Sequence, residues 1–400
     1  MRRYRLSITV AVAFLFVVSR AWSVEVRQAQ YRFILPDGRT DVGEIVPAVV
    51  AFRAAFDGMF AFEGSAETHP CTVRVLENRQ EFDRYLSSRI GETREQYVFL
   101  KYSRPDLSEL ILYPTPGKTG YAAFAGPSLN RQLFLQYLYS FVLEPPLWLR
   151  DGFQAWAERL SWNAKEGKVD IAWYSPWLES AKARRENENE RLSVEALLSA
   201  TTGSYESARM YPQSWAFVAF LTLTDNPGYR RFLHETFALL EGAGRYNAES
   251  QQGNTDLVKK RFLRHASYET AERDFGEWLM SQETYSDIVQ KGVAEYNAGN
   301  HLEAEKKLSQ AIEIRPDDPV IPYYLGLVSY ATGRYDAARV WYERAITFGA
   351  DIAAANWALA LNALAAKDHA SARAYLETAR TTNPERYGER AERYLRSLPR

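Results

Sequence analysis

Between residues 285 and 386 the sequence repeats every 34 residues, and this repeat restricts the possible folds more than any other feature. Small residues recur at this spacing in some columns, and large apolar residues recur between them. Such a period is typical of antiparallel helix pairs that stack on one another, with small residues where helices cross closely. The C-terminal part is therefore predicted to be an all-α array. The columns are Ala304, Ala338 and Ala372; Ala311, Ala345 and Ala379; Leu308, Tyr342 and Leu376; and Gly292, Gly326 and Ala360.

These columns resemble the pattern of tetratricopeptide (TPR) repeats. The resemblance implies an all-α TPR solenoid of three repeats, 285–318, 319–352 and 353–386, followed by a closing amphipathic helix over 387–398. In this family the first helix of each pair lines a concave groove. Carried over by position, the groove residues are Val289, Val293, Tyr296, Asn297, Tyr323, Leu327, Tyr330, Trp357, Leu361 and Leu364.

The predicted groove is apolar and aromatic, which favours an amphipathic helix or an apolar segment of a partner protein. It lacks the Lys, Arg and Asn set with which some TPR proteins hold a terminal carboxylate. The expected partner is thus an unidentified protein or peptide. The alternative is that the preceding domain or the tail of this same chain fills part of the groove.

The first 23 residues are typical of a secretory signal peptide. Three arginines precede an apolar run over residues 6–18, and the small residues Ala21 and Ser23 follow at the spacing of a cleavage site. The apolar run is short for a helix that must cross about 30 Å of hydrocarbon. We expect cleavage after Ser23, with a retained anchor as the alternative. The mature protein is predicted to be periplasmic or envelope-associated, without a transmembrane segment.

The charge balance argues against a nucleic-acid-binding protein, and the cysteine content argues against a disulfide-rich or Cys-rich metal protein. The chain has 49 basic and 50 acidic residues; without the four arginines of the first 23 residues the balance is 45 to 50, or −5. This is not the basic composition that nucleic-acid binding requires. The single cysteine, Cys71, excludes an internal disulfide framework and a Cys-rich metal site.

The region before the repeats mixes strand-like and helical runs over 24–126 and is predicted to be helical over 127–280. A mixed lobe followed by a helical lobe indicates an α+β fold. The predicted strands, rich in β-branched and aromatic residues, are 31–35, 71–76, 96–102 and 109–113. The predicted helices are 46–60, 78–90 (capped by Asn78), 128–143, 146–160, 194–200, 211–224, 229–240 and 271–281.

The run from Pro146 to Trp156, PLWLRDGFQAW, resembles the Pro-x-Trp-Leu-x-Glu-Gly-x-Ala-x-Tyr segment of bacterial gluzincin metallopeptidases of the peptidase-MA-like kind. The run from Tyr211 to Phe217 resembles the helix behind that family's site. The resemblance spans about residues 28–280 and implies a gluzincin-like domain over 24–280. In that family, two histidines of a preceding H-E-x-x-H helix and the glutamate of this segment hold zinc.

The positions that would hold zinc carry other residues in this chain. By spacing, Leu135 and Tyr139 stand at the two histidine positions, Gln136 at the catalytic glutamate and Asp151 at the third ligand. A peptidase zinc needs three protein ligands and a carboxylate base, which hydrocarbon, amide and phenol groups do not supply. The histidines of the chain, no two of them four residues apart, are His69, His234, His265, His301 and His369.

We therefore expect a catalytically inactive pseudopeptidase, without zinc or another cofactor, joined to a TPR module. Its predicted role is that of an exported interaction or scaffolding protein of the cell envelope. The alternative is an active metallopeptidase with nonstandard ligands, such as Asp151 with His234 or His265.

Overall fold

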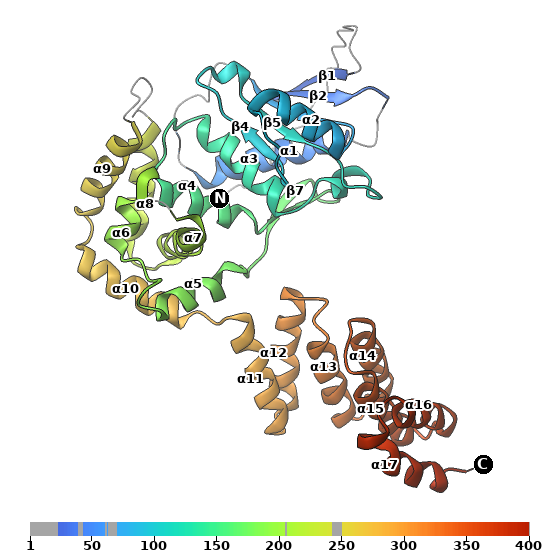
Figure 1. Ribbon diagram of the computed structural model, residues 1–400. Coiled ribbons are helices and arrows are strands. Elements are labelled where there is room, and N and C mark those ends of the chain that lie inside the picture. The colour runs from blue at the N-terminus through green and yellow to red at the C-terminus, as the bar shows by residue number, and fades with distance from the viewer. Residues whose placement is uncertain are drawn as a thin grey trace, which may run out of the picture. The chain divides into compact units, whose positions relative to one another are not determined.

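The computed structural model describes residues 23–38, 43–60, 62, 70–204, 206–241 and 250–399. The chain divides into two compact units, Met1–Ser281 and Gln282–Arg400. Strands and helices are mixed up to Ile171, and the described residues from Trp177 onward contain helices and no strand (Figure 1). This confirms a mixed region followed by a long helical region. Of the predicted signal peptide, residues 1–22 lie outside the described residues.

The N-terminal unit begins with a five-stranded sheet of order β1-β2-β3-β5-β4. Its three central strands are parallel, and the edge strands β1 and β4 are antiparallel to their neighbours. The four predicted strands are confirmed as β2 to β5, with β4 shorter than predicted, whereas β1 was not predicted. The strands are β1 (Ser23–Gln28), β2 (Tyr31–Pro36), β3 (Cys71–Val75), β4 (Val98–Leu100) and β5 (Glu109–Leu112).

Alternate residues of β5 show how helices cover both faces of this sheet. Leu110 and Leu112 join the main core with side chains of α1 (Ile45–Met59) and α3 (Pro127–Tyr139). Ile111 points the other way, into a smaller core with Phe82 and Leu86 of α2 (Arg79–Ile90). Successive side chains of a strand point to opposite faces, so a run of apolar residues here serves two cores. The side chain of Asn78 caps α2 as predicted, because its Oδ1 accepts from the backbone N–H of Glu81 at 3.0 Å.

Two predicted helices end early. The helix predicted to reach residue 143 is α3, which ends at Tyr139, and the one predicted to reach 160 is α4 (Leu147–Ala157). A hairpin of β6 (Leu160–Asn163) and β7 (Lys168–Ile171) follows α4, within the lobe that was predicted to be wholly helical. Its turn ends at Gly167, whose φ of 64° lies in the left-handed region that glycine favours.

The helical part of this unit is organised around α7, which packs against α4. Gly152 allows the close approach, since a Cβ there would lie 2.5 Å from the carbonyl oxygen of Ser214. Trp148 of α4 meets Phe217 of α7 edge to face at 5.4 Å. The helices are α5 (Trp177–Glu186), α6 (Val194–Ser199), α7 (Ser207–Leu223), α8 (Pro227–Glu241), α9 (Ser250–Phe262) and α10 (Tyr268–Ser281).

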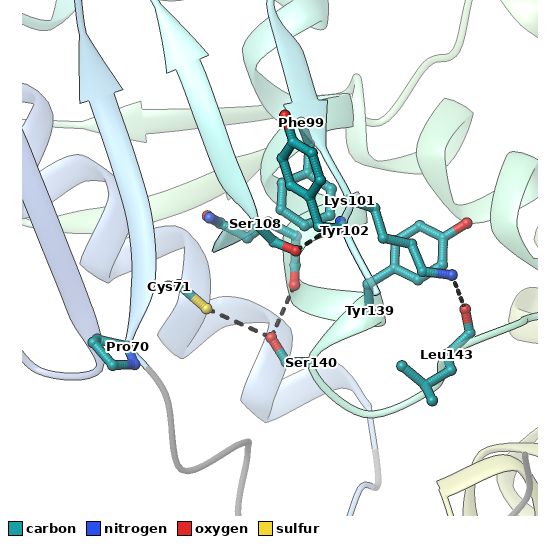
Figure 2. A pocket seen from close by; sticks show the side chains of 10 residues that line it. Pro70, Cys71, Phe99, Lys101, Tyr102, Ser108, Tyr139, Ser140 and Leu143 are labelled. Carbon is teal, nitrogen blue, oxygen red and sulfur yellow. Dashed lines mark hydrogen bonds between the residues drawn. The ribbon is translucent and has the colours of Figure 1, made fainter. Parts of the chain in front are cut away.

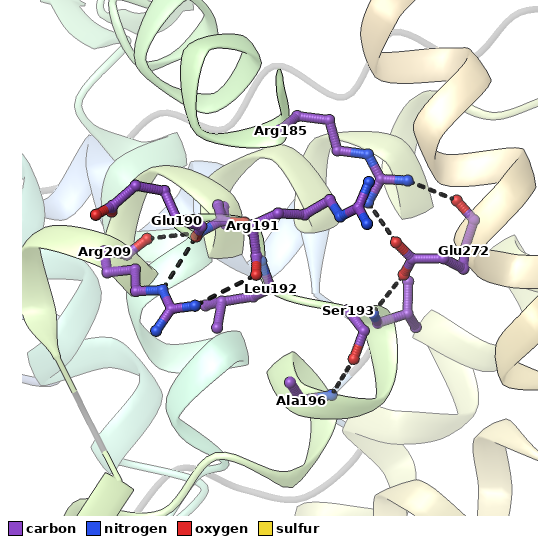
Figure 3. Close-up of polar contacts among 10 residues, drawn as sticks. Arg185, Glu190, Arg191, Leu192, Ser193, Ala196, Arg209 and Glu272 are labelled. Carbon is purple, nitrogen blue, oxygen red and sulfur yellow. Dashed lines mark hydrogen bonds and ion pairs between the residues drawn. The ribbon is translucent and has the colours of Figure 1, made fainter. Parts of the chain in front are cut away.

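A carboxylate of α10 ties the segment between α5 and α6 to the helical core (Figure 3). Glu272 accepts from the guanidinium of Arg185 and, at 2.7 Å, from the backbone N–H of Val194, the first residue of α6. From the other side, Arg209 donates to the carbonyl oxygens of Glu190 and Arg191 at 3.0 and 3.3 Å. A carboxylate at a helix N-terminus satisfies an otherwise unpaired donor and interacts favourably with the helix dipole.

Glu272→Ala should lower the free energy of unfolding of the N-terminal unit by about 2 kcal/mol, because it removes two charge-assisted hydrogen bonds. Urea denaturation of the full chain measures this change. The control is Glu277→Ala on the same helix, at an exposed side chain, which should change stability by less than about 0.5 kcal/mol. Equal effects of the two substitutions would contradict this role of Glu272.

The C-terminal unit consists of three helix pairs and a closing helix. α11 packs on α12, α13 on α14 and α15 on α16, and α17 packs on α16. The closing helix starts at Pro384 rather than at 387, because Asn383 Oδ1 caps it by accepting from the backbone N–H of Arg386 at 3.1 Å. The helices are α11 (Tyr285–Asn297), α12 (His301–Ile314), α13 (Val320–Ala331), α14 (Tyr335–Thr347), α15 (Ile352–Ala365), α16 (His369–Thr382) and α17 (Pro384–Ser397). In the described parts of both units, no helix combines the length and apolar character needed to span a membrane.

Gly326→Ala should loosen the pair α13–α14, because the added Cβ would lie 2.4 Å from Cε1 of the buried Tyr342 ring. Overpacking of this kind costs about 2 kcal/mol, and amide hydrogen exchange in α13 and α14 should become faster. The matched control is Gly388→Ala in α17, where the nearest atom is 3.9 Å away. That change should stabilise its helix by about 0.5 kcal/mol. Unchanged exchange in Gly326→Ala would mean that the two helices do not require this close contact.

Candidate functional site

The helix α3 carries the three motif positions Leu135, Gln136 and Tyr139, and the amide of Gln136 is bound to the sheet. Gln136 is 2% exposed, and its Nε2 donates to the carbonyl oxygen of Thr72 on β3 at 3.0 Å. Its Oε1 is buried and has no partner among the described residues. Leu135, one turn before Tyr139, is half-buried. An amide held in this way is a structural link between helix and sheet.

Asp151, at the position of the third ligand, forms an ion pair with its neighbour in sequence. Its Oδ1 accepts from Nε of Arg150 at 2.6 Å, and the residue is 3% exposed. Burial raises the pKa of the Asp151 carboxyl, and the charge and hydrogen bond of Arg150 oppose that rise. Burial also raises the pKa of the Tyr139 phenol, which Arg150 again opposes. The Arg150 guanidinium thus opposes the effect of burial on the pKa of both side chains.

This arrangement has a chemical consequence for metal binding. A carboxylate that accepts a charge-assisted hydrogen bond from Arg150 is already neutralised by a cation of the chain itself. A divalent metal at Asp151 would lie close to that guanidinium, and like charges at short distance repel strongly in a buried site. The described residues bring no group of three or more His, Cys, Asp or Glu side chains into a geometry that could hold a metal.

A small pocket lies beside the C-terminal end of α3 (Figure 2). Its volume is about 30 Å³, which is room for water but not for a peptide. Within it, Cys71 Sγ lies 3.6 Å from Ser140 Oγ, and that hydroxyl donates to the carbonyl oxygen of Gln136 at 2.8 Å. Lys101 Nζ lies 4.4 Å from the centre of the Tyr139 ring and forms an ion pair with Glu144 at 2.7 Å. Several of the polar side chains that line this pocket are therefore already bonded within the chain.

The edge strand β4 lies next to α3, and side chains of the helix cover its free edge. The backbone N–H of Phe99 donates to Gln132 Oε1 at 2.8 Å, and that of Tyr97 donates to Ser128 Oγ at 3.1 Å. A peptide that adds to a sheet edge needs free backbone donors and acceptors. These two donors are already used within the chain.

The histidines named in the alternative reading are engaged elsewhere or face solvent. His265 Nε2 lies 2.9 Å from Glu235 Oε2, which also accepts from Arg261 at 3.0 Å. These two partners hold the pKa of the Glu235 carboxyl below its ordinary value. His234 is exposed on α8. His69 lies outside the described residues. Among the described residues, neither His234 nor His265 contacts Asp151.

In the C-terminal unit, half-buried apolar side chains form a stripe on the first helix of each pair. Spacings of three and four residues put each stripe on one side of its helix, and α13 packs beside both α11 and α15. We call these residues the first-helix face; Asn297, at the end of α11, is exposed beside it. The stripes are Val289, Val293 and Tyr296; Tyr323, Leu327 and Tyr330; and Leu361 and Leu364.

Trp357, the remaining predicted groove residue, is covered by the closing helix. It is 9% exposed, its ring stacks on Tyr387 at 5.4 Å, and Tyr394 meets it edge to face at 5.7 Å. The guanidinium of Arg390 lies 4.7 Å from the centre of the Trp357 ring. Sequence reasoning missed Arg390 and its neighbour one turn earlier, Arg386, because groove positions were sought only in the three repeats. Their spacing of four residues in an amphipathic helix was the available signal.

Comparison with known proteins adds no family assignment. No protein-family model matches the chain, and a search of the curated proteins finds no match. What the two candidate sites can do therefore follows from their side chains and contacts.

Asp151→Asn tests the charge state of the buried carboxyl through the pH dependence of stability. An Asp carboxyl ordinarily titrates at 3.8, and burial raises the pKa of this one, so the folded chain holds the proton more tightly than the unfolded chain. Stability from this group is present below pH 3.8 and is lost as pH rises through the folded pKa. Asparagine keeps the acceptor for Arg150 but does not titrate. The variant should therefore gain stability relative to the natural chain as pH rises above 3.8.

Urea denaturation at a series of pH values measures the difference. Asp170→Asn, in the partly exposed β6–β7 hairpin, is the control for loss of an exposed carboxylate and should change stability by less than Asp151→Asn. A difference for Asp151→Asn that falls with rising pH would show that Arg150 outweighs burial.

Proposed function

We propose that this protein is an exported pseudopeptidase of the gluzincin kind whose C-terminal TPR-like module binds a partner protein in the cell envelope. In this proposal the N-terminal unit is catalytically inactive and serves as a stable scaffold. The observation that carries it is the ion pair between Arg150 and Asp151. It places a fixed positive charge where the family resemblance puts the third zinc ligand.

Two further contacts support the loss of catalysis. The amide of Gln136 stands at the position of the catalytic base, and an amide cannot accept the proton of a metal-bound water at neutral pH. Its Nε2 is used to hold α3 to β3. The edge of β4, beside the same helix, has two of its backbone donors bound to Gln132 and Ser128. These contacts support a unit that neither activates water at this site nor pairs a substrate peptide along β4.

Support for partner binding comes from the first-helix face. Its side chains are apolar or aromatic and half-buried, so they retain surface that a partner could cover. Stripes on neighbouring helices give an apolar surface of the kind that binds an amphipathic helix. The closing helix covers Trp357, so we assign the binding surface to α11, α13 and the C-terminal half of α15.

The test replaces Val293, in the first-helix face, with a photo-crosslinking amino acid in the full chain, expressed in the cell that makes it. Irradiation should give a crosslink to another protein, because Val293 lies within the proposed contact. The same replacement at Val340, 56% exposed on α14, is the control and should give none.

Metal analysis of the purified chain accompanies the crosslinking experiment. One equivalent of tightly held zinc with chelator-sensitive cleavage of an unfolded protein would establish the alternative, an active metallopeptidase.

A further inference from the structure

The closing helix α17 carries two kinds of arginine. Arg393 and Arg396 form ion pairs with Glu389 and Glu392 one turn earlier, at 3.4 and 3.1 Å. Arg386 and Arg390 are exposed, and neither guanidinium has an ion pair or a hydrogen bond within the described part of the chain. Two cations are thus left without an anion on a helix whose other two arginines are paired.

Both of these arginines lie over aromatic rings at one end of the first-helix face. The guanidinium carbon of Arg390 lies 4.7 Å from the centre of the Trp357 ring, and that of Arg386 lies 5.3 Å from the centre of the Tyr387 ring. The two rings stack on each other at 5.4 Å. A guanidinium over an aromatic face keeps its edge N–H groups available to an acceptor. The rings therefore orient the donors and leave them free.

Arg386 and Arg390 add positive charge beside a face that has none of its own. All of its residues are uncharged, as is the exposed Asn297 beside it. The charge of Arg386 reaches Tyr323 on α13, where it opposes the rise that burial causes in the pKa of the phenol. An apolar surface with a positive end is complementary to an apolar segment with a negative end.

We infer that the first-helix face binds an amphipathic helix of a partner protein that carries acidic side chains at one end, and that Arg386 and Arg390 pair with those carboxylates. This inference rests on the proposed function and names the chemistry of the partner. Arg386 and Arg390 are four residues apart on one helix, so they lie about 6 Å apart along its axis. Carboxylates spaced by three or four residues on the partner helix have the same separation. Each guanidinium can then form an ion pair with one carboxylate.

The experiment uses synthetic peptides of about 15 residues and the full chain, with fluorescence anisotropy as the readout. One peptide has apolar residues at helical spacing, two Glu residues four apart at one end and an amidated C-terminus. The second has Gln in place of both Glu residues. The natural chain should bind the Glu peptide at least about tenfold more tightly than the Gln peptide, since charge-assisted hydrogen bonds are stronger than neutral ones.

The matched variants lie on the same helix. Arg386→Gln with Arg390→Gln should weaken binding of the Glu peptide about tenfold and leave binding of the Gln peptide unchanged. Arg393→Gln with Arg396→Gln removes the same charge from arginines that already have partners, and it should leave both affinities unchanged. Circular dichroism and thermal unfolding check that each variant keeps the fold.

Four results would overturn the inference. Equal affinity of the two peptides for the natural chain, or no binding of either, would show that carboxylates are not recognised. Equal loss in both arginine pairs would indicate a general charge effect rather than a specific contact. A Gln peptide with a free terminal carboxylate that binds as tightly as the Glu peptide would show that the occupant is a chain end. The crosslink from Val293 tests the proposed function separately, because it requires no particular partner charge.

Discussion

The burial of α3 between the sheet and the following helices is the constraint on which the N-terminal unit depends. This helix contacts α1, α4, β4 and β5, and its aromatic side chains fill the centre of the core. Phe134 and Tyr137 both pack against Phe56 and Phe60 at ring distances of 5.2–5.8 Å. A helix fixed on one side by such packing can leave only its remaining side open to a ligand. Away from these rings, the buried Gln136 bonds to the sheet and Tyr139 lies beside Arg150 and Lys101.

Much of the fold was predictable from apolar periodicity and capping residues. The central strands are short apolar runs between turns, and Asn78 marked the start of α2. The polar edge strand β1 (SVEVRQ) lacks a clear apolar run and was missed, and so was α9, whose sequence SQQGNTDLVKKRF has little apolar periodicity. The ends of α3 and α4 were set too late, because the turns that follow are fixed by tertiary contacts that local propensity does not include. The division of the helical C-terminal part into pairs followed from the 34-residue period.

The sequence shows which residue types occupy the candidate sites, but it does not show which of these side chains contact one another. The absence of imidazole at 135 and 139 is visible in the sequence, but the ion pair that neutralises Asp151 is not, because adjacent residues of a helix usually point apart. Likewise, the sequence identifies apolar stripes on the first helices but not the position of α17 over Trp357. The two units also differ in how their charged side chains are paired. The buried carboxylate at position 151 has a cation beside it, whereas two arginines of α17 have aromatic rings beneath them and no anion.

The hydrogen bonds that α3 provides to β4 also bear on solubility. An uncovered sheet edge is a template on which another copy of a chain can add a strand, and such addition leads to aggregation. At β4, Gln132 and Ser128 already accept from two backbone donors, so this edge offers few sites for intermolecular pairing. At the opposite side of the sheet, the edge strand β1 carries the charged side chains of Glu25 and Arg27, and charges on an edge disfavour pairing with a second copy.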